Sequence, residues 1–318
     1  MLAVMVTGRL IVFPAILVLA LCAVTSAEGD GQSQQSQQQT TPDSTSKKPP
    51  PPLFPRSRRG VYRNGQGVEF VDAVPQSPPL ETDDPGVPDK GAYEINLSVA
   101  GDLFQGGQRL DLLFVDANYG IQPAIKGHEL PTQLKFEFPV AAFRTNGEPF
   151  AVGIGAAKFG VKFNFYNSGR KGLSLAFYPQ LEFAAPGTDG VEKGLAEPGQ
   201  IVILPLLLAK EFHDVSFVFN AALEKPVHDP DHEATSIMGV AFGRAITRKV
   251  AAMVEVRGES TFDLARDRLV FLNVGLIRGV RNVVVYAHVG RSVFSDDGFS
   301  HVFVGAGLKV SIEPKDAR

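Results

Sequence analysis

The sequence predicts an all-β fold: an antiparallel transmembrane β-barrel of about 12 strands, of the outer-membrane type. The first observation is a unit repeated from residue 92 to residue 312, a run of roughly ten residues that is apolar at every second position, followed by a turn. The second is an apolar N-terminal stretch typical of exported proteins. The third is a regular alternation of long and short connections, for which a soluble β-sandwich gives no reason.

Composition narrows the class of protein further. The 318 residues carry a net charge of −3, so we expect no nucleic-acid partner. The mean hydropathy of +0.03 argues against helical membrane spans but agrees with a barrel, whose strands average an apolar and a polar face. The single cysteine, Cys22, lies in the expected signal peptide, so disulfides and thiolate metal sites are not expected in the mature chain.

Residues 1–27 have the three parts of a secretory signal peptide. Arg9 supplies the positive charge, residues 11–24 are apolar, and Thr25-Ser26-Ala27 is a small-residue cleavage site. We therefore expect export with removal of the signal. Lipidation of Cys22 is the alternative, although Leu21 before it is larger than such sites usually tolerate.

Residues 28–91 predict a low-complexity Gln/Pro-rich linker. The Gln/Ser run at 32–39 cannot bury enough apolar surface to fold, and the prolines at 49–52 favour extended polyproline II. A solvated spacer is the simplest interpretation. The alternative is that Arg56, Arg58 and Arg59 contact peptidoglycan, a partner or lipid head groups.

Twelve strands follow from the alternation of apolar and polar residues. We expect them near residues 92–100, 108–119, 126–142, 150–166, 172–184, 200–212, 214–223, 236–246, 249–259, 268–279, 282–292 and 300–312. An even number of strands places both ends of the barrel, residues 92–312, on one side of the membrane. Residues 313–318 form a C-terminal tail.

The connections alternate in length with strand number. Those after odd-numbered strands include the long segments 185–199, 224–235, 258–268 and 293–298. Those after even-numbered strands are short, at 167–171, 213, 247–248 and 279–281. Outer-membrane barrels combine long external loops with short periplasmic turns. Residues 120–125 should be a short turn, but the sequence does not fix its boundaries.

The polar face of each strand predicts a lumen lined by ionisable side chains. A Lys or Arg that faces lipid at mid-membrane costs roughly 2–4 kcal/mol, so charged residues should point inward. The expected lumen-lining residues are Glu94, Lys135, Glu137, Lys158, Lys162, Glu182, Glu255, Arg257, His288, His301 and Lys309. Opposed charges across a narrow lumen select small polar or zwitterionic solutes. The alternative is a set of structural ion pairs that fills the interior.

Two strands depart from the simple pattern. The apolar positions of the fourth strand change phase near Ala157, which predicts a β-bulge. The sixth strand is apolar on both faces from Ile201 to Leu208, apart from Pro205. The lumen should therefore have a hydrophobic sector at that strand.

Metal and catalytic sites find little support. His228, Asp231 and His232 have the chemistry of divalent-cation ligands, but they lie in an expected external loop, and Pro230 prevents a helical arrangement. We expect no metal site and no cofactor. No nucleophile elbow frames a serine, and His288 and His301 are more simply structural, so we expect no enzyme activity.

Three segments between residues 112 and 183 resemble the MetA-pathway-of-phenol-degradation family of outer-membrane barrel proteins. They are Val115-Asp116-Ala117-Asn118-Tyr119-Gly120, Leu134-Lys135-Phe136-Glu137-Phe138-Pro139 and Phe159-Gly160-Val161-Lys162-Phe163. The resemblance implies a barrel that passes small, often hydrophobic or aromatic compounds. One departure is the tail after Ile312, because many such barrels end on an aromatic residue.

Together these features predict a monomeric channel or facilitator for small solutes in the outer membrane of a Gram-negative bacterium, with lipid and the solute as its partners. A barrel without transport, acting as a structural or surface-interaction protein, is one alternative. A soluble periplasmic β-protein that binds a lipophilic ligand is the other.

Overall fold

The computed structural model describes residues 62–64, 67–169, 171–212, 215–227, 233–296 and 298–314. The chain divides into two units, 1–55 and 56–318, and all described residues belong to the second. The expected signal peptide, the candidate metal ligands His228, Asp231 and His232, and residues 315–318 of the tail lie outside the described residues.

The described residues form strands and turns. Their strands are β1 (Tyr62–Asn64), β2 (Gly67–Phe70), β3 (Tyr93–Phe104), β4 (Gly107–Ile121), β5 (Ala124–Ile125), β6 (His128–Glu129), β7 (Thr132–Thr145), β8 (Ala151–Ile154), β9 (Ala156–Ser168), β10 (Leu173–Phe177), β11 (Gln180–Ala184), β12 (Gln200–Phe212), β13 (Val215–Pro226), β14 (Thr235–Thr247), β15 (Val250–Thr261), β16 (Leu269–Val280), β17 (Val283–Ser295) and β18 (Val302–Ile312). Within the described ranges there is no helix with the length and hydrophobicity of a membrane span.

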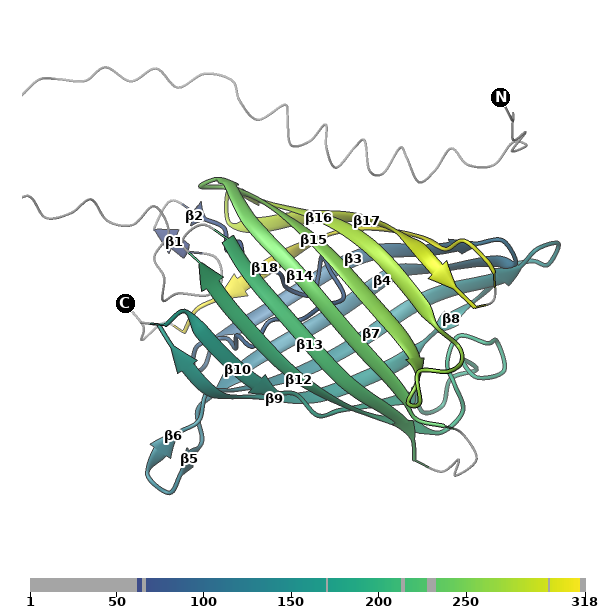
Figure 1. The fold of residues 1–318 in the computed structure, drawn as a ribbon, viewed down its shortest axis with the longest axis horizontal. Coiled ribbons are helices and arrows are strands. Elements are labelled where there is room, and N and C mark those ends of the chain that lie inside the picture. The colour runs from purple at the N-terminus through teal and green to yellow at the C-terminus, as the bar shows by residue number, and fades with distance from the viewer. Residues whose placement is uncertain are drawn as a thin grey trace, which may run out of the picture. The chain divides into compact units, whose positions relative to one another are not determined.

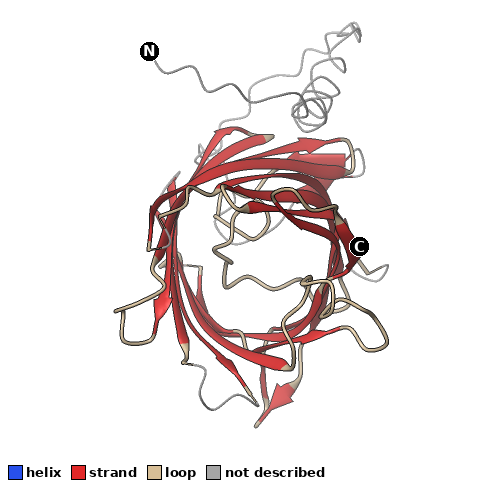
Figure 2. Cartoon of the chain, turned by 90° about the vertical axis from the view of Figure 1, so that its right-hand side faces the viewer, coloured by secondary structure: helices blue, strands red, loops and turns tan. Residues whose placement is uncertain are grey.

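One antiparallel sheet of 14 strands closes into a barrel (Figures 1 and 2). β8 and β9 together form one strand of the wall, and β10 and β11 form another, so the 14 strands occupy twelve positions. The wall closes where β18 pairs with β3, from Ile312 beside Tyr93 to Val302 beside Leu103. The predicted fold class, an antiparallel barrel of about twelve strands, is confirmed.

The two ends of the barrel differ in their connections. The turn end carries Tyr93, Ile312 and the short links between β9 and β10, β12 and β13, β14 and β15, and β16 and β17. The opposite loop end carries the long connections 185–199, 227–234, 262–268 and 296–301. Two connections depart from this rule. The link between β3 and β4 at the loop end is only residues 105–106. At the turn end, the β5–β6 hairpin (Figure 1) extends the connection, so β7 begins at Thr132 and not at residue 126.

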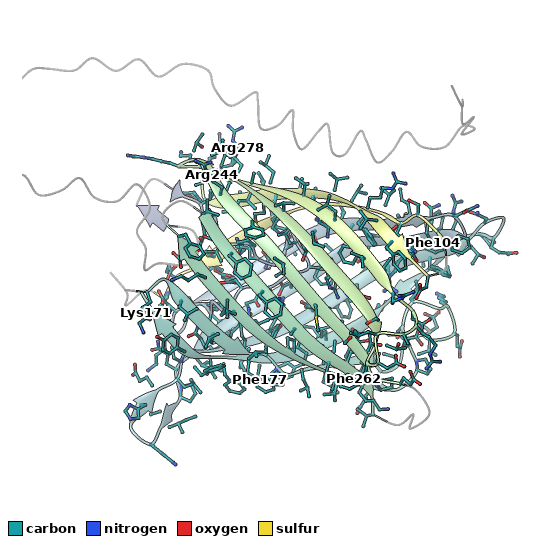
Figure 3. All side chains as sticks on the ribbon, viewed as in Figure 1. Phe104, Lys171, Phe177, Arg244, Phe262 and Arg278 are labelled. Atoms are coloured by element: carbon teal, nitrogen blue, oxygen red, sulfur yellow. The ribbon has the colours of Figure 1, made fainter. Side chains whose placement is uncertain are left out.

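The outer wall exposes apolar side chains along most of its strands (Figure 3). Examples are Phe165 on β9, Phe177 on β10, Met238 on β14 and Val274 on β16, which are 39–52% exposed. Water-soluble proteins rarely expose an apolar surface of this extent, whereas a barrel in lipid needs one. The same surface argues against the alternative of a soluble periplasmic protein.

The fourth wall strand contains the predicted bulge. Glu137 pairs with Lys158, and Val140 pairs with Ile154. Three residues separate the two partners on β7, but four separate the two partners on β8 and β9. One extra residue therefore interrupts the ladder at Gly155, between β8 and β9, next to the predicted position. This shift returns Lys158 and Lys162 to the inner face, where both form ion pairs.

The chain before β3 runs inside the barrel, which the sequence did not predict. We call residues 71–92 the inner segment; Figure 2 shows this chain crossing the interior of the ring. Its first part lies at the turn end, where the Val71 amide donates to the Arg248 carbonyl at 3.0 Å. Its last part returns there, and the Gly91 amide donates to the Gly120 carbonyl at 2.8 Å. The C-terminal third of the expected linker is thus packed in the lumen and is not a solvated spacer.

Glycines on the inner wall allow this close packing. A Cβ atom added to Gly243 on β14 would lie 1.9 Å from the carbonyl oxygen of Ala73. One added to Gly275 on β16 would lie 3.0 Å from the ring of Pro79. The inner segment therefore touches the wall at positions where a larger residue does not fit.

Candidate functional site: the barrel lumen

The centre of the lumen is held by Glu255 on β15, one of the predicted lumen-lining residues. Its side chain is fully buried and accepts hydrogen bonds from the backbone amides of Glu81 and Thr82 and from the Thr82 hydroxyl. Asn273 on the next strand donates to the same carboxylate at 2.9 Å. A buried carboxylate needs such donors, so Glu255 fixes the middle of the inner segment against the wall.

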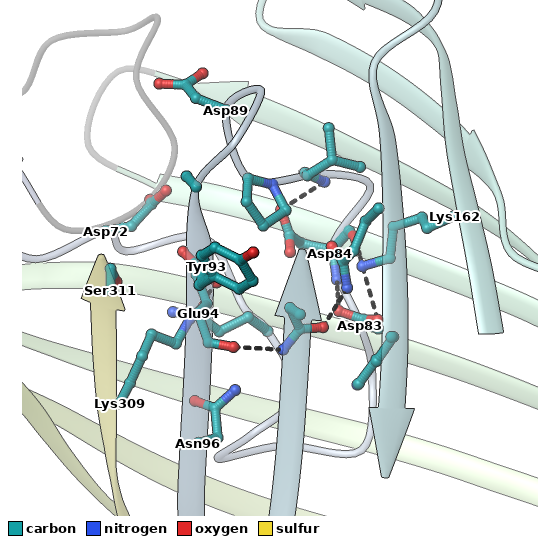
Figure 4. Close-up of a pocket in the computed structure, with 18 of the residues that line it drawn as sticks. Asp72, Asp83, Asp84, Asp89, Tyr93, Glu94, Asn96, Lys162, Lys309 and Ser311 are labelled. Carbon is teal, nitrogen blue, oxygen red and sulfur yellow. Dashed lines mark hydrogen bonds and ion pairs between the residues drawn. The ribbon is translucent and has the colours of Figure 1, made fainter. Parts of the chain in front are cut away.

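Lys162 on β9 holds the inner segment on the other side of the lumen (Figure 4). Its Nζ atom lies 2.8 Å from the Asp83 carboxylate and donates to the Asp84 carbonyl at 2.9 Å. Asn164, two residues further along β9, donates to the Pro85 carbonyl at 2.7 Å. The side chain of Lys162 is only 2% exposed, so this ion pair is shielded from water and depends on close geometry.

A chain of alternating charges crosses four neighbouring wall strands. It runs from Asp116 on β4 to Lys135 and Glu137 on β7, Lys158 on β9 and Glu182 on β11. The successive nitrogen–oxygen distances are 3.5, 2.8, 3.8 and 3.3 Å. Because adjacent members have opposite sign, every charge in this chain has an opposite charge beside it.

The remaining predicted residues have separate partners. Arg257 on β15 pairs with Glu81 at 3.3 Å and Glu259 at 2.7 Å. Lys309 on β18 lies 3.6 Å from Glu94 on β3 and also donates to the side chain of Gln76 in the inner segment.

The two histidines are placed differently. The ring of His288 on β17 lines the cavity described below, and its Nδ1 atom is buried without a hydrogen bond. His301 lies just before β18 at the loop end, where Nδ1 is 3.2 Å from the Asp102 carboxylate. The two histidines therefore do not form a joint site.

Two features of the lumen were missed from the sequence. Asp116 accepts hydrogen bonds from Asn96 at 2.9 Å and Asn118 at 2.8 Å, and the alternation along β3 and β4 could have placed all three on the inner face. Thr82 and Asp83 belong to a segment without alternation. Their pairing with Glu255 and Lys162 left no signal in the sequence.

The inner segment separates two cavities. The larger one, of about 340 Å³, extends toward the loop end, and we call it the loop-end chamber. Its wall includes Lys158 and Arg257, and it includes Ile203, Pro205 and Leu207 of β12, which form the hydrophobic sector expected there. The smaller cavity, of about 90 Å³, lies toward the turn end beside Glu94, Lys162 and Lys309 (Figure 4).

The connection between β11 and β12, residues 185–199, folds back onto the barrel at the loop end. Leu195 is fully buried, and its carbonyl accepts a hydrogen bond from Arg109 at 3.2 Å. Lys193 donates to the Val152 carbonyl at 2.7 Å and pairs with Asp189. The hydrogen bond from Lys193 lowers the pKa of the Asp189 carboxyl below its usual range.

Metal binding finds no support in the described part of the chain, where no group of three or more His, Cys, Asp or Glu side chains could hold an ion. Three of the lumenal carboxylates, Glu137, Asp83 and Glu255, are instead paired with ammonium or amide groups. The described lumen is therefore polar, with one apolar sector at β12.

Comparisons with known proteins identify structures with a similar fold. No family model and no curated protein matches the sequence. Among solved structures, an outer membrane channel from Pseudomonas putida F1 is 10% identical, with a TM-score of 0.62 over 73% of this chain and 100% of that chain. The NanC porin is 9% identical, with a TM-score of 0.47 over 67% of this chain and 98% of that chain. The likeness to the Pseudomonas protein shows that this chain has the fold of an outer-membrane barrel.

Proposed function

We propose that this protein is an outer-membrane channel for the passive passage of small solutes, hydrophobic or aromatic ones among them. The observation that carries the proposal is the loop-end chamber inside a closed, lipid-facing barrel. A lumen with polar groups lowers the free-energy cost of moving a polar solute across a membrane. An apolar sector of the lumen can contact the carbon skeleton of that solute. The similar fold of a channel from Pseudomonas putida F1 supports the proposal.

The inner segment controls this passage. It lies between the two cavities, so a solute passes only when the segment moves. Glu255, Lys162, Asn164 and Lys309 hold it through polar contacts that water can replace. Since both of its ends lie at the turn end, it would withdraw in that direction.

The same proposal covers location and assembly. The chain would reach the outer membrane of a Gram-negative bacterium after removal of residues 1–27, with the turn end toward the periplasm. It would act as a monomer, because every wall strand already has two neighbours in its own chain. Membership of the MetA-pathway-of-phenol-degradation family belongs to this proposal as well.

Planar-bilayer recordings test the channel. The full-length chain should give brief openings. A variant in which two anchors are weakened, Lys162→Met with Glu255→Gln, should conduct for longer. Folding of both proteins is checked by their heat-modifiable gel mobility. Folded barrels that pass neither ions nor small solutes in either form would overturn the proposal.

A structural or surface-interaction barrel without transport is the second candidate. The observation that favours it is the filling of the lumen by the inner segment and by the chain of ion pairs from Asp116 to Glu182. In that case, weakening the anchors lowers stability without creating conductance, which the same recordings distinguish.

A further inference from the structure

The lining of the loop-end chamber has more carboxylate than ammonium and guanidinium groups. Each cation of its wall is already paired with two carboxylates. Lys135 and Lys158 belong to the chain of ion pairs, and Arg257 lies between Glu81 and Glu259. None of these cations is left to neutralise an incoming anion, and a further carboxylate would meet groups of its own sign.

Several acceptors of the chamber receive no hydrogen bond from a described residue. The Oδ1 atoms of Asp111 and Asn220 are buried and accept no hydrogen bond, and Arg109 approaches Asp111 only to 3.9 Å. Glu224 also lines the chamber and has no ion pair or hydrogen bond with a described residue. A buried acceptor without a donor is costly, so a ligand that brings N–H donors would gain from entering.

Two of these acceptors stand on one strand with apolar residues beside them. Asn220 and Glu224 are four residues apart on the inner face of β13, a separation of roughly 13 Å in an extended strand. The neighbouring β12 residues opposite them are Leu207 and Ile203. Between these two rungs lie Ala222 and its partner Pro205, so an apolar strip connects the two polar ends.

We propose that the loop-end chamber selects small organic cations with an apolar body, of which a linear aliphatic diamine is the simplest. One ammonium group would bind the Glu224 carboxylate, the carbon chain would lie along Ala222, Pro205 and Ile203, and the other end would donate to Asn220. This inference rests on the proposed channel function and names the class of solute. It also excludes carboxylates as preferred solutes.

Isothermal titration of the full-length, detergent-solubilised barrel tests the selection. The probes are 1,6-diaminohexane, 1,6-hexanediol and adipate, which share a six-carbon skeleton and differ in charge. We expect the diamine to bind at least about tenfold more tightly than the diol or the dicarboxylate, as expected for the gain of one charge-assisted hydrogen bond. Equal binding of all three, tighter binding of adipate, or no binding of the diamine would overturn the inference.

Two matched variants locate the site. Glu224→Gln should weaken diamine binding about tenfold. Glu94→Gln makes the same charge change at the turn end, outside the chamber, and should leave binding within about twofold. Unchanged binding in Glu224→Gln would contradict the assigned site. If that variant does not fold, Asn220→Leu replaces it with the same expectation.

The binding test and the conductance test can fail independently, because binding is measured without transport. A conducting barrel that does not prefer the diamine refutes the inference about the solute but not the channel. A barrel that does not conduct refutes the channel.

Discussion

The carboxylate of Glu255 on β15 accepts a hydrogen bond from the backbone amide of Thr82, 173 positions earlier in the chain. The same oxygen accepts from the Thr82 hydroxyl, and the other oxygen accepts from Glu81 and Asn273. A charge on the inner face of a strand thus accepts hydrogen bonds from backbone amides of a segment that has no sheet partner of its own. This contact joins the part of the chain before the barrel to the middle of its wall.

Replacing this carboxylate should release the inner segment. In Glu255→Gln the side-chain amide presents an N–H group to donors, so at least one hydrogen bond to a charged acceptor is lost. The local stability of the inner segment should fall by about 1.5–3 kcal/mol. Hydrogen exchange of the amides of Glu81 and Thr82 measures this change, and both should exchange faster.

Glu259→Gln is the matched control for that substitution. Glu259 lies on the same strand and forms an ion pair with Arg257, a wall residue, and not with the inner segment. Exchange at Thr82 should therefore stay close to the wild-type rate. If exchange at Thr82 were equally fast in both variants, the total charge on β15, and not the contact between Glu255 and Thr82, would protect the inner segment.

The pair between Lys162 and Asp83 should be strongly coupled. Lys162→Met leaves a shielded carboxylate without its cation, and breaking such a pair costs about 3–5 kcal/mol. Asp83→Asn in the same chain should recover part of that loss, because no buried charge then remains. A double-mutant cycle on the unfolding free energy in lipid vesicles measures the coupling, and strictly additive effects would contradict the contact.

A methyl group on the inner wall should displace the inner segment. Gly243→Ala brings a Cβ atom to 1.9 Å from the Ala73 carbonyl oxygen, so the two backbones must separate. Gly258→Ala on β15 is the control, since its new Cβ would lie 3.7 Å from Val270 in ordinary contact. Hydrogen exchange over residues 71–80 should accelerate in the first variant only.

Lipid contact predicts a depth-dependent cost for charge on the outer wall. Val274 lies at the middle of β16 and is 50% exposed, so Val274→Arg should destabilise the barrel by roughly 2–4 kcal/mol. Ile246 is 61% exposed near the turn end of β14, and Ile246→Arg should cost only about 0–1 kcal/mol. Reversible unfolding in vesicles compares the two, and equal small effects would argue against a bilayer at mid-strand.

Local patterns were sufficient to predict most of the wall. The twelve wall strands, the facing of Lys135 and Glu255, and the bulge beside Gly155 follow from the period of two and from the cost of charge in lipid. The β5–β6 hairpin was missed, because residues 120–125 carry neither a clear turn nor a clear strand pattern.

The inner segment could not be predicted in this way. Residues 71–92 contain prolines, glycines and aspartates, as an exposed linker would. Their order comes from contacts such as Thr82 with Glu255, which are remote in the chain and leave no periodic pattern. The chain of ion pairs was only partly predicted, since each charge could be placed on the inner face but its partner across the lumen could not.

Control of passage by the inner segment can be tested by tethering that segment to the wall. A Cβ atom at Gly239 would lie 3.7 Å from the Cβ atom of Thr82, within the range that a disulfide needs. Thr82→Cys with Gly239→Cys therefore allows a reversible lock in a mature chain expected to have no other thiol, since Cys22 lies in the signal peptide. Single-channel conductance of this variant should be low when oxidised and should rise on reduction. The same conductance in both states, with the disulfide formed in one of them, would contradict the account.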